Sequence, residues 1–497
     1  MHTPFAPVAS WLPRYFQGPA STWKGRVARD AIAGATIGAM VVPQSLSYAA
    51  VAGVPPAHGL YADLQVVYPF LGTSPYLVIG PVAVMSLMVR ATAEQAGGGV
   101  LMEGSVEWGR YAAFLALLVG LFQILMGVFR VGSKVAKHVS HTIIAAFTAS
   151  AGILICSTQL SSVLGLKACK VASEIPGGRP TSCSFASKIF HALTLSGGGD
   201  AKTAFIGFNS IAFLLFARSS FLKELLGPQR AYLTRMGSLA IIAAGIAYAW
   251  MTGSCAEQGG SLSCVGYLPP GLPGFYFPVP PIPVVGFWQL VGILRAIVPL
   301  SFIGYAEALA IAKSAQARYA SRELVAGNLQ NAAFPSGDVD EDQELVALGA
   351  CNVWSSLFQG FTVTGSFSRT AINADSGAMS PISVLFAAGV VVLTLLVLTP
   401  VMSLLPKAVV SAVVIVAISR LIDPEEFAKL YRTGDRHGCA VYLSTFLATL
   451  AFGVDAGLCL GIAVDSIEKV RRSLRQFMTK RISRALSRQF SSGSLSA

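Results

Sequence analysis

Residues 363–373 have the sequence VTGSFSRTAIN, which sets Arg369 in an otherwise apolar part of the chain. The segment that starts after Gly365 is too short to cross a bilayer as an ordinary helix. An arginine at membrane depth requires a counter-charge or an anionic ligand. The free N–H groups and the dipole of a helix start favour an anion as well. Together with Ser366 and Ser368, Arg369 is therefore predicted to begin a half-helix at an oxyanion site.

The chain around this stretch has the composition of a membrane protein. Of its 497 residues, 54% are hydrophobic and 12% are charged, whereas soluble domains carry about twice that charged fraction. The net charge of +12 comes mostly from short loops and the C-terminal tail, where basic residues fix orientation. We therefore predict an all-α polytopic membrane protein that contacts the lipid bilayer and has no nucleic-acid partner.

A second short segment, GPVAVMSL at residues 80–87, matches the first in position. Each is the third apolar segment in a group of seven, and each follows a Gly or Gly-Pro break. Interrupted segments at corresponding positions of two halves indicate a transporter site at the membrane midplane. We expect 14 transmembrane segments in a 7+7 inverted repeat, with half-helices three and ten. The expected spans are 31–50, 54–72, 78–93, 109–130, 140–160, 201–219 and 236–252, then 287–312, 344–360, 367–377, 380–399, 405–421, 438–453 and 455–470.

The first span carries polar residues in its apolar sequence, VVPQSLSYAAVAGVPPAHGLY at residues 41–61. Gln44 and Tyr48 are four positions apart, so they share one face of a helix. Polar side chains inside a span face the protein interior or a cavity. They either bond neighbouring helices or line the anion cavity, and the oxyanion site expected around Arg369 favours the cavity.

Glu307 lies in the middle of the eighth span, in FIGYAEALAIAKS at residues 302–314, with no further charge before Lys313. A buried carboxylate without a partner takes up a proton, whereas pairing with Arg369 would keep it ionised. We expect Glu307 to bind the coupling proton and to form one charge-balanced unit with Arg369. A purely structural ion pair is the alternative.

Basic residues cluster in loops that are separated from one another by even numbers of predicted spans. These loops therefore share one side of the membrane with the tail, and the positive-inside rule places both termini in the cytosol. The long loops 161–200 and 253–286 then face outward, where disulfides persist. Each loop holds one cysteine pair, and we expect the disulfides Cys169–Cys183 and Cys255–Cys264, with free thiols as the alternative. No Cys/His spacing resembles a metal site, and no metal or cofactor is expected.

The acidic sequence PSGDVDEDQEL, residues 335–345, is expected to cap the helix that follows it. No signal peptide is visible at the N-terminus. We favour the plasma membrane, with an organelle envelope as the alternative because the leader is basic and lacks acids before Asp30. The expected domains are a cytosolic leader (1–30), a transmembrane domain (31–470, with repeats 31–252 and 287–470) and a basic cytosolic tail (471–497).

Three long motifs carry a family resemblance: PQSLSYAAVAGVPPAHGLYADL, GTSPYLVIGPVAVMSLMV and DQELVALGACNVWSSLFQGFTVTGSFSRTAIN. They resemble the sulfate permease family of anion transporters, from WLPRY at residues 11–15 to the last span. The resemblance implies a core domain moving against a gate domain, and a homodimer. With the residues predicted above, it implies a substrate site made of Gln44, Tyr48, Val82, Ala83, Ser366, Phe367, Ser368 and Arg369.

The resemblance also places Glu307 at the span-eight carboxylate of proton-coupled, plant-type members. By the same resemblance, sodium-coupled members carry an Asp at this place, with a Thr one turn later. This chain has Ile311 at the position of the Thr, and an isoleucine cannot ligate Na⁺. Val82 replaces an aromatic residue of several relatives. The family usually carries a cytosolic STAS domain after the membrane part, and this sequence has none there, through truncation or by nature.

These features predict a secondary active anion transporter, a proton-coupled sulfate symporter that works by alternating access. Its partners would be a small inorganic anion and the proton. The alternatives are an exchanger of bicarbonate, chloride or another small anion and, from a different class, an anion channel or a voltage-responsive membrane protein. An enzyme is not expected, because no nucleophile–base pair or metal cluster is visible in the sequence.

Overall fold

The part of the chain that the computed structural model describes is almost wholly helical. It comprises residues 7–17, 19–97, 103–136, 141–166, 170–171, 181–182, 200–217, 230–255, 262–279, 287–325, 339–419, 422, 424–452, 457, 460–467 and 471. The first helices are α1 (Val8–Tyr15), α2 (Ala20–Ala52), α3 (Pro56–Ala62), α4 (Tyr68–Leu71), α5 (Ala83–Gly97), α6 (Val106–Val128), α7 (Gly132–Ala136), α8 (His141–Val163), α10 (Ala201–Phe216) and α12 (Arg230–Thr252). Then follow α13 (Phe287–Val325), α14 (Glu341–Leu357), α15 (Phe367–Asp375), α16 (Ile382–Leu393), the π-helix η4 (Thr394–Leu398), α17 (Thr399–Met402), α18 (Lys407–Ile418), α19 (Pro424–Arg432) and α20 (Arg436–Phe452). The strands within these residues are β1 (Ile79–Gly80), β2 (Lys170–Val171), β3 (Thr181–Ser182) and β4 (Thr364–Gly365).

Helices of membrane-spanning length occur in both halves of the sequence. Five stretches among the described residues are long and apolar enough to cross a membrane: Ala20–Ala52, Val106–Val128, Ala145–Val163, Leu294–Gln316 and Ile382–Met402. Shorter apolar helices cover Ala201–Phe216, Ala240–Thr252 and Lys407–Val416. The helices agree with the predicted all-helical membrane class, and the number of fourteen spans stays a prediction.

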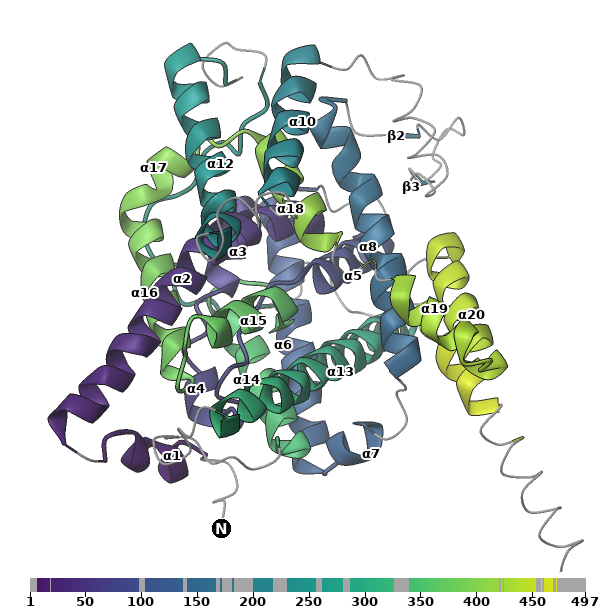
Figure 1. The fold of residues 1–497 in the computed structure, drawn as a ribbon. Helices are drawn as coiled ribbons and strands as arrows, with labels where there is room; N and C mark the ends of the chain where they lie inside the picture. Colours follow the sequence, from purple (N-terminus) through teal and green to yellow (C-terminus); the bar gives the residue numbers. More distant parts are fainter. Residues whose placement is uncertain are drawn as a thin grey trace, which may run out of the picture. The chain divides into compact units, whose positions relative to one another are not determined.

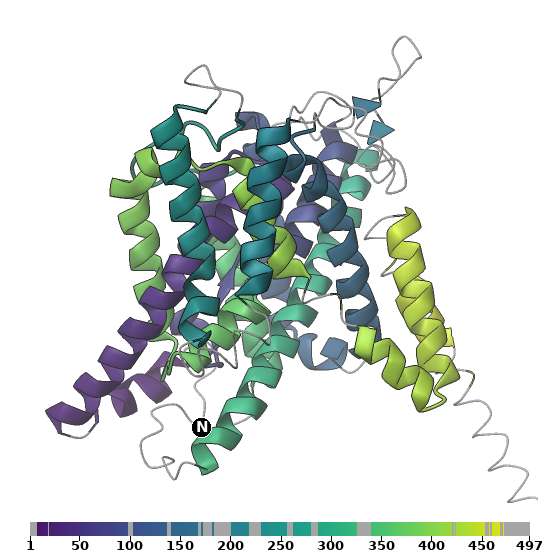
Figure 2. The same ribbon diagram turned by 45° about the horizontal axis from the view of Figure 1, so that its top comes forward.

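Long helices from opposite ends of the sequence pack side by side. α16 lies along α2, α14 lies along α6, and α10 lies beside both α12 and α18 (Figures 1 and 2). Gly38 of α2 permits the first of these contacts, because a Cβ atom there would lie 2.5 Å from Val390 Cβ of α16. Apolar side chains of α2, α16 and α18 share one core, which includes Val41, Val391 and Val413.

The second predicted span, residues 54–72, is not one helix. The chain leaves α2 at Gly53, whose φ of +74° is the left-handed geometry of a helix C-cap, and Pro56 then starts α3. Asp63 is the C-cap of α3, and α4 begins only at Tyr68. The expectation of an ordinary span was wrong because prolines and this acidic residue divide the apolar segment.

The acidic loop caps the next helix, as its composition predicted. Asp340 stands at the N-cap of α14 and accepts hydrogen bonds from the main-chain N–H groups of Asp342 (3.1 Å) and Gln343 (3.0 Å). These bonds satisfy two of the donors that a helix start leaves without a partner.

One of the two expected cysteine pairs lies within the described residues. Cys255 and Cys264 are joined by a disulfide, with their Cα atoms 5.6 Å apart. The main-chain N–H of Lys407 donates to Ser263 O at 2.9 Å, so the disulfide lies against the start of α18. Cys169 and Cys183 lie outside the described residues.

The chain divides into two compact units. The first consists of residues 1–138 and 152–420, and it contains every residue of the candidate site described below. The second consists of residues 139–151 and 421–497. Within the second unit, His437 Nε2 lies 3.0 Å from Asp465 Oδ1.

Candidate anion site

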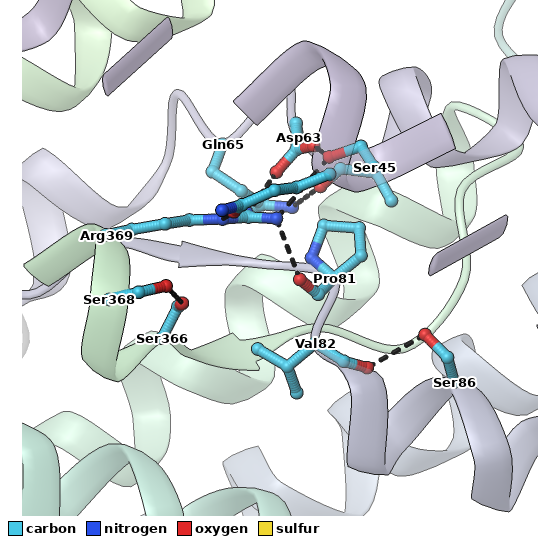
Figure 3. A network of polar contacts seen from close by, with 11 residues as sticks. Ser45, Asp63, Gln65, Pro81, Val82, Ser86, Ser366, Ser368 and Arg369 are labelled. Atoms are coloured by element: carbon cyan, nitrogen blue, oxygen red, sulfur yellow. Dashed lines mark hydrogen bonds and ion pairs between the residues drawn. The ribbon is translucent and has the colours of Figure 1, made fainter. Parts of the chain in front are cut away.

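A two-stranded sheet brings the starts of two helices together. β1 and β4 pair antiparallel, with Ile79 opposite Gly365 and Gly80 opposite Thr364. α5 begins three residues after β1, and α15 begins two residues after β4. The paired strands therefore place both helix N-termini in one region, shown in Figure 3. This is the juxtaposition that the two interrupted segments predicted.

Hydrogen bonds fix β4 and the start of α15 in place. The hydroxyl of Thr364 donates to Gly304 O of α13 at 2.5 Å. The N–H of Ser366 donates to Val78 O at 3.0 Å, and the N–H of Val78 donates to Thr370 Oγ1 at 3.1 Å. These bonds tie α15 to the segment before α5 on one side and to α13 on the other.

Arg369 extends from the first turn of α15 into a set of buried acceptors (Figure 3). Its side chain is 0% exposed, and Nη1 lies 2.7 Å from Asp63 Oδ1 in an ion pair. Nε donates to Gln44 Oε1 at 3.1 Å, and Nη2 donates to Pro81 O at 3.0 Å. The guanidinium carbon lies 5.8 Å from the centre of the Tyr48 ring. The structure thus brings Gln44, Tyr48 and Arg369 together.

The counter-charge of Arg369 is Asp63 and not Glu307. The expected Glu307–Arg369 pair was wrong, because the guanidinium is engaged by Asp63 and the other acceptors just described. Glu307 is buried in α13, and its Oε2 has no hydrogen-bond partner within the described part of the chain. Tyr48 interacts electrostatically with both Asp63 and Glu307, so both carboxylates belong to the same neighbourhood.

Asp63 is the site residue that the sequence analysis missed. It is buried, and its Oδ2 accepts a hydrogen bond from the hydroxyl of Ser45 on α2. One sequence signal was available: between Asp30 and Arg90, Asp63 is the only Asp, Glu, Lys or Arg. A lone acid in an apolar segment is as unusual at membrane depth as the lone arginine.

The helix starts also offer hydrogen-bond donors that have no acceptor within the described part of the chain. The hydroxyls of Ser366 and Ser368 lie 3.4 Å apart, and Phe367 between them is 40% exposed. Among the described residues, no acceptor is found for the main-chain N–H groups of residues 367–369 at the start of α15 or of residues 83–85 at the start of α5. Figure 3 shows Ser366, Ser368 and Val82 away from the end of the Arg369 side chain. Free N–H groups at a helix start are suited to an anion.

Gly80 is predicted to be essential for the Arg369–Asp63 pair. A Cβ atom at residue 80 would overlap both Arg369 Nη1 and Asp63 Oδ1, so Gly80→Ala should separate the two charges. We expect it to lower the free energy of unfolding by about 1–3 kcal/mol, as overpacking does. Thermal unfolding of the purified variant measures this loss.

Gly389→Ala is the control for this substitution. Gly389 lies in α16, and no atom is found within 4 Å of the position that a Cβ atom would take there. Alanine also favours a helix by about 1 kcal/mol over glycine. The control should therefore be neutral or stabilising. An equal loss in both variants would show that the space at Gly80 does not matter.

The fold and the paired half-helices define an all-helical, multi-pass integral membrane protein. Within that class, the chain belongs to the sulfate permease family, whose family model matches residues 27–445. The family is one of membrane transporters and not of enzymes.

Named relatives match most of this chain. Sulfate transporter 4.1, chloroplastic, of Arabidopsis thaliana is 30% identical over 458 residues, which make up 92% of this chain and 59% of that relative. The sodium-independent sulfate anion transporter of Bos taurus is 29% identical over 486 residues, covering 92% of this chain and 71% of the relative. The chain thus spans less than two thirds of the length of the Arabidopsis relative.

Solved structures share the fold. The structure of SLC26A9 superposes with a TM-score of 0.77 at 22% identity, covering 94% of this chain and 68% of that one. The transmembrane domain of the cyanobacterial bicarbonate transporter BicA superposes with a TM-score of 0.64 at 19% identity, covering 89% of this chain and 97% of that one.

Proposed function

We propose that this protein is a secondary active transporter that carries sulfate together with protons by alternating access. The observation that carries the proposal is the pair of helix starts, α5 and α15, held together by β1 and β4. Each helix start contributes about half a positive charge. Their N–H groups, which have no acceptor among the described residues, and the hydroxyls of Ser366 and Ser368 form a donor set for an oxyanion.

The proposed substrate site consists of the residues around these helix starts. Val82 directly precedes α5, which begins at Ala83, and Ser366 is the N-cap of α15, which begins at Phe367. Gln44 and Tyr48 contact Arg369, whose charge is held beside the site by Asp63. The relatives named as sulfate transporters support sulfate as the anion.

Glu307 is the proposed proton-binding residue. It is buried, carries an oxygen without a hydrogen-bond partner among the described residues, and has no counter-charge there. It lies one turn after Gly304, whose carbonyl holds Thr364 of β4. A charge change at Glu307 would therefore occur directly behind the strand that leads into α15.

We also propose the domain organisation, the topology and the oligomeric state of the protein. The transmembrane domain of residues 31–470 would contain the 14 segments as a 7+7 inverted repeat of residues 31–252 and 287–470, with core and gate domains. Residues 1–30 and 471–497 would be cytosolic, as would both termini. We propose a homodimer, the plasma membrane and two outward disulfides, of which Cys255–Cys264 is formed in the structure.

Uptake of labelled sulfate into proteoliposomes tests the function. We expect accumulation above the equilibrium level when the outside is more acidic than the inside. Without the proton gradient, accumulation should vanish, and a Na⁺ gradient should not restore it. Sulfate uptake that requires chloride or bicarbonate inside and ignores the pH gradient would instead show an exchanger. Flux that never exceeds equilibrium under any gradient would indicate a channel.

A further inference from the structure

The guanidinium of Arg369 is already occupied by groups of the protein. Nη1 donates to Asp63 Oδ1, Nε donates to Gln44 Oε1, and Nη2 donates to Pro81 O, at distances between 2.7 and 3.1 Å. Ser45 Oγ lies 3.5 Å from Nη2 as a more distant fourth neighbour. An anion at the helix starts therefore meets an arginine whose charge is compensated.

The ion pair of Asp63 and Arg369 is buried and closely packed. Their side chains are 2% and 0% exposed, and Gly80 lies so close that any side chain there would displace them. The second carboxylate oxygen of Asp63 is bonded by Ser45. Both charges are held in one geometry, so the carboxylate is a fixed part of the electrostatic field at the site.

We infer that Asp63 is a specificity-determining residue: a tethered carboxylate that neutralises Arg369 and so sets the charge that the site offers to its anion. The inference rests on the proposed function in that it places the anion at the starts of α5 and α15. With the ion pair neutral, the two helix ends supply a total of about one positive charge. Such a site suits a monovalent anion, or a divalent anion that enters together with a proton.

Removing the Asp63 charge should change the preference between anions of different charge. Asp63→Asn keeps an oxygen acceptor for Arg369, and the Ser45 hydroxyl can accept from the new amide. Coulomb's law with an effective dielectric of about 20 gives roughly a tenfold effect per unit of anion charge across about 10 Å. The variant should therefore bind chloride roughly tenfold and sulfate roughly hundredfold more tightly. The sulfate-to-chloride affinity ratio should rise about tenfold.

The test is titration of the purified full chain in detergent with sulfate and with chloride at constant ionic strength. Asp30→Asn is the matched control, since Asp30 is a fully buried carboxylate on the same helix as Gln44 and lies about 20 Å along its axis. It should leave the affinity ratio unchanged. An unchanged ratio in Asp63→Asn, or an equal shift in both variants, would overturn the inference.

A second variant covers the case in which Asp63→Asn, with its buried unpaired arginine, does not fold. Asp63→Asn with Arg369→Gln removes both charges and should keep the wild-type ratio. A ratio that falls about tenfold in this double variant would show that Arg369 was not neutralised. Wild-type protein that binds chloride but not sulfate would refute sulfate as substrate, while a gain of sulfate binding in Asp63→Asn would still support the role of Asp63.

Discussion

Arg369→Gln is expected to abolish anion binding and to lower the free energy of unfolding by about 3–5 kcal/mol, the cost of breaking a buried ion pair from one side. Asp63 would remain buried next to Gly80 with no counter-charge. Its negative charge would then repel an anion at the starts of α5 and α15. Thermal unfolding and sulfate titration of the purified variant measure the two effects.

The double variant Asp63→Asn with Arg369→Gln shows whether Arg369→Gln loses anion binding through the unpaired charge of Asp63 or through the loss of Arg369 itself. Because neighbours in one network are not additive, it should recover about 1–3 kcal/mol of the lost stability. Anion binding should return in part, because the helix starts and the hydroxyls of Ser366 and Ser368 are untouched. If the double variant folds well but binds no anion, Arg369 contacts the substrate directly, and the neutral-pair description is incorrect.

Much of the core arrangement follows from local sequence. Gly365, and Gly80 with Pro81, interrupt apolar segments in corresponding positions, and the structure places the two following helices at one small sheet. The prediction of one helix for the second span was wrong because mean hydropathy averages over residues 54–72. The average hides that Pro56 starts a new helix and that Asp63 ends it. Apolar composition shows that a segment is buried, but a few backbone-breaking residues decide whether it crosses as one helix.

The partner of Arg369 could not be chosen from the sequence alone. A buried arginine requires a counter-charge or an anionic ligand, and the sequence offers two acids in apolar surroundings, Asp63 and Glu307. Both are far from Arg369 along the chain, so the tertiary structure decides which carboxylate reaches the guanidinium. The structure selects Asp63 and leaves Glu307 without a counter-charge among the described residues.

Because Arg369 pairs with Asp63 and not with Glu307, the variant Glu307→Gln tests proton binding by Glu307 alone. Glu307 makes no ion pair in the described part of the chain, so the amide breaks none and the variant should fold like the wild type. Glu341→Gln is a control on a different carboxylate, which pairs with Lys313 at a solvent-exposed position. An exposed pair contributes about 0–1 kcal/mol, so this control should keep both its fold and proton-driven uptake.

Glu307→Gln is expected to eliminate proton-driven accumulation of sulfate completely, because no group at that depth of α13 would then exchange a proton. Anion binding should survive or tighten, since the amide carries no negative charge to repel sulfate. Any remaining flux should be exchange that ignores the pH gradient, whereas wild-type uptake should rise as the external pH falls, with protonated Glu307 as the competent form. Uptake in proteoliposomes with and without an inward proton gradient measures this difference. Continued accumulation in Glu307→Gln would transfer the coupling role to another group, and Asp63, the second buried carboxylate near Tyr48, would be the first to test.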